Sequence, residues 1–118
     1  MRDKLLWLMP LLLVWGCATI PLVSDTEVQD AMKLERNQAQ GKDLYEHACI
    51  FCHRTKGEGG GVAVGTLERA MAKRDEDLYR AIKTGKGSWM PAFSKMTPKE
   101  TVDVITYIRS LFLEQPHG

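Results

Sequence analysis

Residues 48–57 read ACIFCHRTKG, with two cysteines three positions apart and a histidine directly after the second. The apolar residues of the segment 41–53 (GKDLYEHACIFCH) recur at helical spacing, so Cys49 and Cys52 are predicted to share one side of a helix with Tyr45. The third cysteine, Cys17, lies far from this pair. An odd number of cysteines argues against a disulfide framework.

Cys49, Cys52 and His53 are residue types found in three kinds of site. A structural zinc ion needs four ligands, and this cluster offers three at most, two of them adjacent in sequence. A thioredoxin-like redox pair needs neighbouring strands, and the sequence predicts none. The pattern C-x-x-C-H is typical of haem attachment: two thiols one turn apart form thioethers with the vinyl groups, and the histidine binds iron from the proximal side. We therefore expect one covalently bound haem c.

Methionine is the ligand expected at the sixth coordination position, because a soft neutral thioether raises the iron potential and suits electron transfer. The chain has methionines at positions 1, 9, 32, 71, 90 and 96. Met90 is favoured because GKGSWMPAF places it in a loop that the following proline stiffens. Met71 and Met96 are expected to fill core gaps instead. Trp89 and Phe93, on either side of Met90, are expected to contact the haem.

The secondary-structure pattern predicts an all-α fold with three or four helices around the haem. Asp75 is predicted to cap the helix that Gly85 ends. Thr97 and Glu100 form a predicted capping box, with Pro98 at the first helical position. The expected helices span residues 41–53, 75–84 and 97–112, with a short turn over 66–72 and a glycine-rich loop between the first two.

Residues 40–113 resemble a small class I cytochrome c, with Cys49 and Cys52 as attachment points and His53 and Met90 as axial ligands. That family crosses its first and last helices through a glycine and an aromatic residue, and Gly41 and Tyr45 have the matching spacing before Cys49. The resemblance implies that Val104 and Tyr107 are their counterparts on the last helix. The sequence departs from the family in one respect: the family commonly has a proline after the haem-binding helix, and no proline lies between His53 and Met90. The carbonyl that accepts from the proximal imidazole is therefore expected among residues 57–64.

The N-terminus is predicted to direct export. Residues 1–16 combine a charged start with eleven mostly apolar residues, too few to span a bilayer as a helix and typical of a signal peptide. The run ends in VWGC, which resembles a bacterial lipobox, so Cys17 is the expected lipidation site; an uncleaved N-terminal anchor is the alternative. Residues 17–39 are predicted to be a lipid anchor and flexible tether, in preference to a weak helical face of Val28, Met32 and Leu34. Residues 40–118 are predicted to form a monohaem domain on the periplasmic side of a bacterial membrane.

The sequence has no second catalytic constellation, so the expected function is one-electron transfer between membrane and periplasmic redox proteins rather than enzymatic turnover. The alternatives are a fixed electron-entry subunit of a larger oxidoreductase and a sensor of small ligands through a labile Met90. The formal net charge of +1 gives no indication of nucleic-acid binding. Four lysines near the expected haem edge form a basic ring that would steer partners with acidic docking surfaces, and the alternative is a solvated surface of mixed charge. The ring comprises Lys56, Lys83, Lys86 and Lys95.

Overall fold

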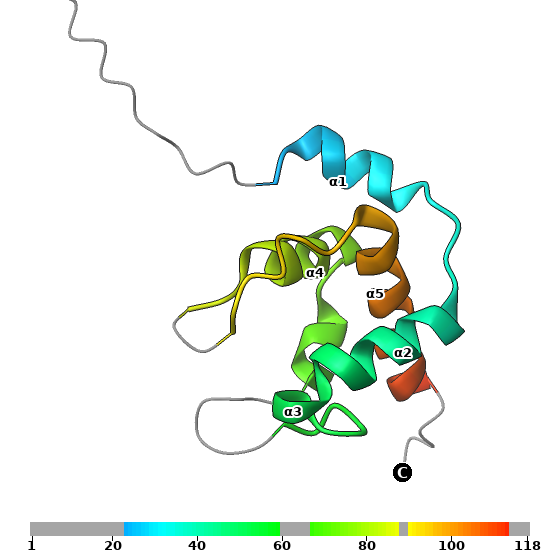
Figure 1. Cartoon of the computed structure of the whole chain (residues 1–118), viewed down its shortest axis with the longest axis vertical. Coiled ribbons are helices and arrows are strands. Elements are labelled where there is room, and N and C mark those ends of the chain that lie inside the picture. The colour runs from blue at the N-terminus through cyan, green and yellow to red at the C-terminus, as the bar shows by residue number, and fades with distance from the viewer. Residues whose placement is uncertain (1–22, 60–66, 88–89, 114–118) are drawn as a thin grey trace, which may run out of the picture.

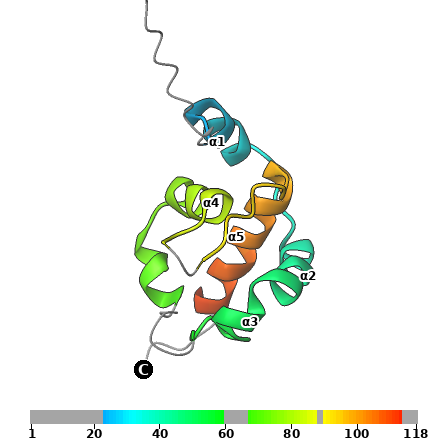
Figure 2. The same cartoon turned by 60° about the vertical axis from the view of Figure 1, so that its left-hand side comes forward.

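The computed structural model describes residues 23–59, 67–87 and 90–113. These parts of the chain contain five α-helices and one 3-10 helix, arranged as in Figures 1 and 2. The elements are α1 (Asp25–Met32), α2 (Gln38–Ala48), α3 (Ile50–His53), η2 (Leu67–Ala72), α4 (Asp75–Thr84) and α5 (Pro98–Leu113). Within the described ranges the only strand-like feature is an isolated bridge between Lys86 and Met90. The predicted all-α cytochrome c fold is confirmed, but the expected number of three or four helices is too low, because α1 was not expected and the first expected helix is divided into α2 and α3.

The helices α2 and α5 pack closely at Gly41. A Cβ atom at Gly41 would lie 1.9 Å from the Asp103 carbonyl oxygen and 3.1 Å from Tyr107 Cβ, so only glycine permits this approach. One turn further along, the fully buried Tyr45 ring meets Tyr107 edge to face, with 5.3 Å between ring centroids. The contact between these two helices was predicted from the resemblance, and the structure confirms it.

The N-terminus of α5 has the predicted capping box. Glu100 N–H donates to Thr97 Oγ1 at 3.1 Å, and Thr97 N–H donates to Glu100 Oε1 at 2.9 Å. Two of the free N–H groups at the helix start are thereby satisfied. The helix then buries Val104 and Ile105 completely, which anchors it in the core of the domain.

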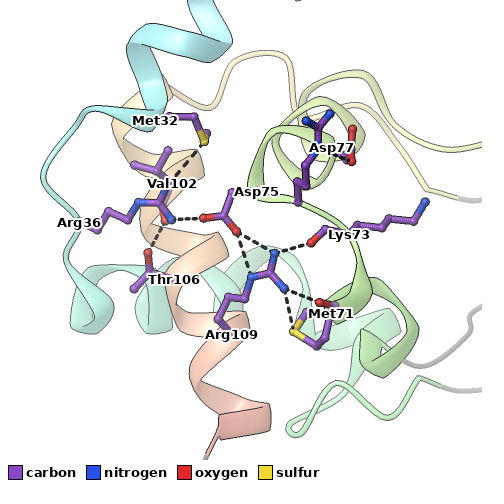
Figure 3. A network of polar contacts seen from close by, with 10 residues as sticks. Met32, Arg36, Met71, Lys73, Asp75, Asp77, Val102, Thr106 and Arg109 are labelled. Atoms are coloured by element: carbon purple, nitrogen blue, oxygen red, sulfur yellow. Dashed lines mark hydrogen bonds and ion pairs between the residues drawn. The ribbon is translucent and has the colours of Figure 1, made fainter.

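Asp75 has a different role from the predicted cap of α4. Arg74 occupies the cap position without a side-chain bond, and Asp75 is the first helical residue. Its carboxylate accepts hydrogen bonds from Arg36 at 2.7 Å and from Arg109 Nε at 3.0 Å (Figure 3). Arg109 also donates to the Met71 carbonyl at 2.9 Å. This network joins α4, α5, η2 and the segment before α2. The predicted end of α4 at Gly85 is confirmed, and Gly85 has a φ of +80° there.

The predicted flexible tether is wrong for the part of it that the structure describes. Residues 25–32 form α1, whose Val28 and Ala31 are fully buried against the domain. Tyr79 Oη donates to Glu27 Oε1 at 2.7 Å, and Arg80 donates to the Val23 carbonyl at 2.9 Å. The apolar face of α1 is short, but it finds a partner surface on α4 and α5, where Figure 1 shows it lying. Residues 1–22, including Cys17, lie outside the described residues.

Candidate functional site

The two cysteines lie at the junction of α2 and α3. The predicted single helix over 41–53 is interrupted at Cys49, which ends α2 and precedes α3. Backbone hydrogen bonds to the Cys49 carbonyl come from Cys52 N–H at 3.3 Å and from His53 N–H at 2.9 Å, so one tight turn holds all three residues. Cys49 is half-buried and Cys52 is exposed, and both thiols are free.

A cavity of about 270 Å³ opens beside this turn. It brings together Cys49, His53, Met90 and Phe93, which lie up to 44 positions apart in the sequence. Cys52 does not line it. The other lining residues are mostly apolar: Leu67, Ala70, Leu78, Ala81, Ile82 and Ile108. Three cationic side chains also line the cavity: Arg69, Lys73 and Lys86. An apolar cavity with a few convergent polar groups is the usual form of a cofactor site.

The imidazole of His53 lines the cavity and has one ring nitrogen without a partner in the described part of the chain. Its Nδ1 atom is buried and has no hydrogen-bond partner among the residues that the structure describes. Burial also lowers the pKa of His53, which favours the neutral ring that binds a metal ion. The acceptor predicted among residues 57–64 is not supplied by residues 57–59, and residues 60–64 fall outside the described ranges.

The residue after His53 has an unusual backbone conformation. Arg54 has φ +61° and ψ 176°, a region that is essentially restricted to glycine. Its carbonyl accepts a hydrogen bond from Tyr45 Oη at 2.5 Å and another from Gly57 N–H at 3.2 Å. These contacts hold a strained residue directly beside the histidine. The sequence offered no sign of it, because arginine is not a residue expected at positive φ.

Met90 begins a segment, residues 90–96, that packs on the C-terminal half of α4. Met90 and Lys86 exchange backbone hydrogen bonds of 3.1 and 3.2 Å, and Phe93 N–H donates to the Ile82 carbonyl at 2.9 Å. A Cβ atom at Gly85 would lie 2.6 Å from the Met90 carbonyl oxygen, so glycine is required for this packing. We call residues 90–96 the Met90 segment. Trp89 lies outside the described residues.

The other two candidate methionines of the domain are not among the cavity-lining residues. Met71 and Met96 are partly buried and pack against the core, as expected. The Met71 sulfur lies 3.8 Å from Arg109 Nη1, and the Met96 carbonyl accepts from Lys83. Among the methionines that the structure describes, Met90 alone lines the cavity.

The expected basic ring is wrong in one member. Lys83 is buried, with 9 % of its surface exposed, so it does not contribute to a docking surface. Lys56, Lys86 and Lys95 are exposed, as a docking ring requires.

The residues at this cavity fit a covalently held haem. Two free thiols lie on one turn, and the neighbouring imidazole carries an unsatisfied buried nitrogen. The Cys49 thiol has its pKa raised to about 11 by burial, so it is protonated at neutral pH. A thioether and an apolar wall complete the cavity. The fold and the cavity together define a monohaem class I c-type cytochrome.

Comparison with known proteins gives the family. Residues 36–108 match the family model described as cytochrome c oxidase, cbb3-type, subunit III, and the chain belongs to this family. It is also 38 % identical over 65 residues to chloroplastic cytochrome c6 of Arabidopsis thaliana, a match that covers 51 % of this chain and 37 % of the relative. The chain thus spans well under two thirds of that relative's length. No solved structure matches the chain.

Membership of this cytochrome c family suggests electron transfer and implies a covalently bound haem c. It does not assign roles to individual residues. Among the residues that the structure describes, no helix is both long enough and apolar enough to cross a membrane.

Proposed function

We propose that this protein carries one electron at a time through a single haem c attached to Cys49 and Cys52, with His53 and Met90 as axial ligands. The observation that carries the proposal is the apolar cavity, because Cys49, His53 and Met90 all line it. A covalently bound iron porphyrin supplies the one-electron couple, which no side chain of this chain provides.

The protein's own residues tune and protect that couple. With a histidine and a methionine as ligands, no coordination position stays open for a substrate, so electron transfer is favoured over bond chemistry. Leu78 and Ile82 on α4 and Ile108 on α5 exclude water from the cavity, and an apolar surrounding favours the less charged, reduced centre. The paired backbone bonds between Lys86 and Met90 limit movement of the ligand loop during the redox cycle.

The identity of the sixth ligand is tested with Met90→Ala and the matched control Met96→Ala. A methionine–iron bond gives ferric haem proteins a weak charge-transfer band in the far red. We expect Met90→Ala to abolish this band and to let carbon monoxide bind the reduced protein rapidly, whereas Met96→Ala keeps the band. If the band survives in Met90→Ala, or if the wild type binds carbon monoxide as rapidly as the variant, the six-coordinate carrier is the wrong assignment.

A second candidate is a fixed electron-entry subunit of a larger oxidoreductase. The family description favours it, since it names a subunit of an oxidase rather than a free carrier. The two candidates differ in stoichiometry: a subunit purifies with its enzyme in a constant ratio from gently solubilised membranes, and a carrier does not. A constant ratio that survives high salt would assign this protein to the subunit class.

We also propose that the chain is exported and held at the periplasmic side of a bacterial membrane through a lipid on Cys17. The support is the sequence of residues 1–17 alone. Mass spectrometry of the purified protein tests this: a diacylated N-terminal cysteine is expected, and Cys17→Ala should release the protein from the membrane fraction. A wild-type mass that includes residues 1–16 without a lipid would exclude this anchor.

The exposed lysines near the site support a partner with an acidic docking surface. Lys56, Lys86 and Lys95 are exposed, and Lys86 also lines the cavity. Electrostatic steering predicts that electron exchange with such a partner slows as ionic strength rises. Lys86→Gln should reduce both the rate and its salt dependence, and a rate that is independent of salt would contradict this docking mode.

A further inference from the structure

Lys83 is a charged side chain in the interior of the domain. Its relative exposure is 9 %, and lysine is almost never buried unless it is paired. The ammonium group donates to the Ser94 carbonyl at 3.0 Å and to the Met96 carbonyl at 2.5 Å. Both acceptors belong to the Met90 segment. Lys83 therefore binds α4 to the stretch of chain that leads from Met90 to α5.

The counterion of Lys83 comes from α1. Glu27 Oε1 lies 3.9 Å from Lys83 Nζ and also accepts the hydrogen bond of Tyr79 Oη at 2.7 Å. Burial, followed by the hydrogen bond to Glu27, raises the pKa of Tyr79, so this hydroxyl stays a donor at neutral pH. A buried cation needs such compensation, because its transfer out of water is costly without a partner.

The helix that carries Glu27 is firmly docked. Val28 and Ala31 bury their side chains completely, and Arg80 on α4 donates to the Val23 carbonyl and forms an ion pair with Asp25. The family match begins at residue 36, so α1 lies before the matched region. Contacts thus run without interruption from α1 through Lys83 to the Met90 segment.

We propose that α1 braces the Met90 segment, with Lys83 as a positioning residue for the Met90 ligand and the partly exposed Glu27 as its counterion. The inference rests on the proposed function, in which Met90 binds the iron. Removal of Glu27 leaves the ammonium group with carbonyl partners alone in the interior. Lys83 then gains solvation by turning outward, and the Met90 segment loses the two hydrogen bonds that hold it on α4.

The test compares Glu27→Gln and Lys83→Met in the full-length, haem-loaded protein. Imidazole, which competes with methionine for ferric iron, is titrated while the far-red charge-transfer band is recorded. We expect imidazole to bind each variant at least about fivefold more tightly than the wild type, the lower end of typical coupling between sites. We also expect the gain in imidazole affinity of the double variant to be smaller than the product of the gains of the two single variants, because both changes break the same interaction.

Two controls separate positioning from general loss of stability. Lys95→Met removes an exposed lysine from the same segment, and Ile105→Val loosens the buried core without removing a polar contact of Lys83. Thermal unfolding is measured for all variants. The brace predicts tighter imidazole binding only in the Glu27 and Lys83 variants. Ile105→Val should bind imidazole like the wild type, even if it lowers the unfolding midpoint. Equal imidazole affinity in these variants and the controls would overturn the brace.

Met90→Ala distinguishes failure of the brace from failure of the proposed function. If Met90→Ala tightens imidazole binding but Glu27→Gln and Lys83→Met behave like the controls, Met90 is the ligand and the brace is wrong. If Met90→Ala leaves imidazole binding and the far-red band unchanged, the proposed ligand itself is wrong and the brace falls with it.

Discussion

Gly85→Ala should lower the stability of the domain and weaken the proposed bond between Met90 and the haem iron. Gly85 ends α4 with φ +80° and ψ 173°, a conformation found essentially in glycine alone. A Cβ atom there would lie 2.6 Å from the Met90 carbonyl oxygen and 2.9 Å from Ala92 N. Both neighbours are backbone atoms, so they cannot rotate away, and the whole loop must move to admit a methyl group.

The magnitude follows from two costs. The backbone conformation costs about 1–3 kcal/mol for a residue with a side chain, and overpacking against fixed atoms adds about 1–3 kcal/mol. Gly87→Ala is the matched control: its φ is +59°, but no described atom lies within 4 Å of the added Cβ. It should therefore cost only about 1–2 kcal/mol for the left-handed conformation. Restriction of the unfolded chain by alanine is the same in both variants and cancels.

Chemical denaturation and the far-red band of the ferric holoprotein provide the assay. We expect Gly85→Ala to be less stable than Gly87→Ala by about 1–4 kcal/mol, which for a domain of this size lowers the midpoint of thermal unfolding by at least about 4 °C. The band should weaken in Gly85→Ala alone, because the displaced atoms belong to Met90 and the residues after it. Equal stability and equal bands in the two variants would refute the packing argument.

Three further substitutions test other parts of the fold. Arg54→Gly should stabilise the protein by about 1 kcal/mol in denaturant unfolding, because relief of about 1–3 kcal/mol of strain exceeds the entropy cost of glycine; a loss of stability would contradict the strain. In Asp75, hydrogen bonds from Arg109 and Arg36 outweigh burial and hold the pKa below the ordinary 3.8. The stabilisation that ionised Asp75 contributes is therefore complete above pH 3.8 and is lost as the pH falls through the lower pKa of the folded state. Asp75→Asn should make the free energy of unfolding less dependent on pH in the acid range; an unchanged dependence would count against this role. Gly41→Ala should prevent folding or lower the unfolding midpoint sharply, since the contact of 1.9 Å with the Asp103 carbonyl must lengthen by about 1.5 Å to become ordinary; a normal midpoint would show that α2 and α5 can separate.

The parts of the fold that could be predicted depend on signals close together in the sequence. The capping box of Thr97 and Glu100 spans four residues, and the turn that holds Cys49 and His53 spans five. Gly85 was expected to end α4 because a glycine follows an apolar helical pattern, and it does so. The packing at Gly41 was predictable only through the resemblance, since its partner Asp103 lies 62 positions away.

The parts that could not be predicted depend on pairings across long separations. Asp75 looked like a cap because acidic residues favour helix starts, yet two arginines from distant segments bind its carboxylate instead. Lys83 looked like a surface charge because most lysines are exposed, yet Glu27 and two carbonyls compensate it in the interior. The helical face of α1 is too short to indicate burial without knowledge of the surface on which it docks.

The docking of α1 also sets how far the haem domain can stand from a membrane. If residues 17–39 were all flexible, a lipid on Cys17 would allow the domain to move up to about 75 Å from its anchor. Because α1 packs on the domain and Arg80 binds the Val23 carbonyl, only residues 17–23 separate Cys17 from the domain, and seven residues span at most about 20 Å. Under the proposed lipidation, the protein would exchange electrons within a thin layer at the bilayer surface, and its partners would have to present their redox centres in that layer.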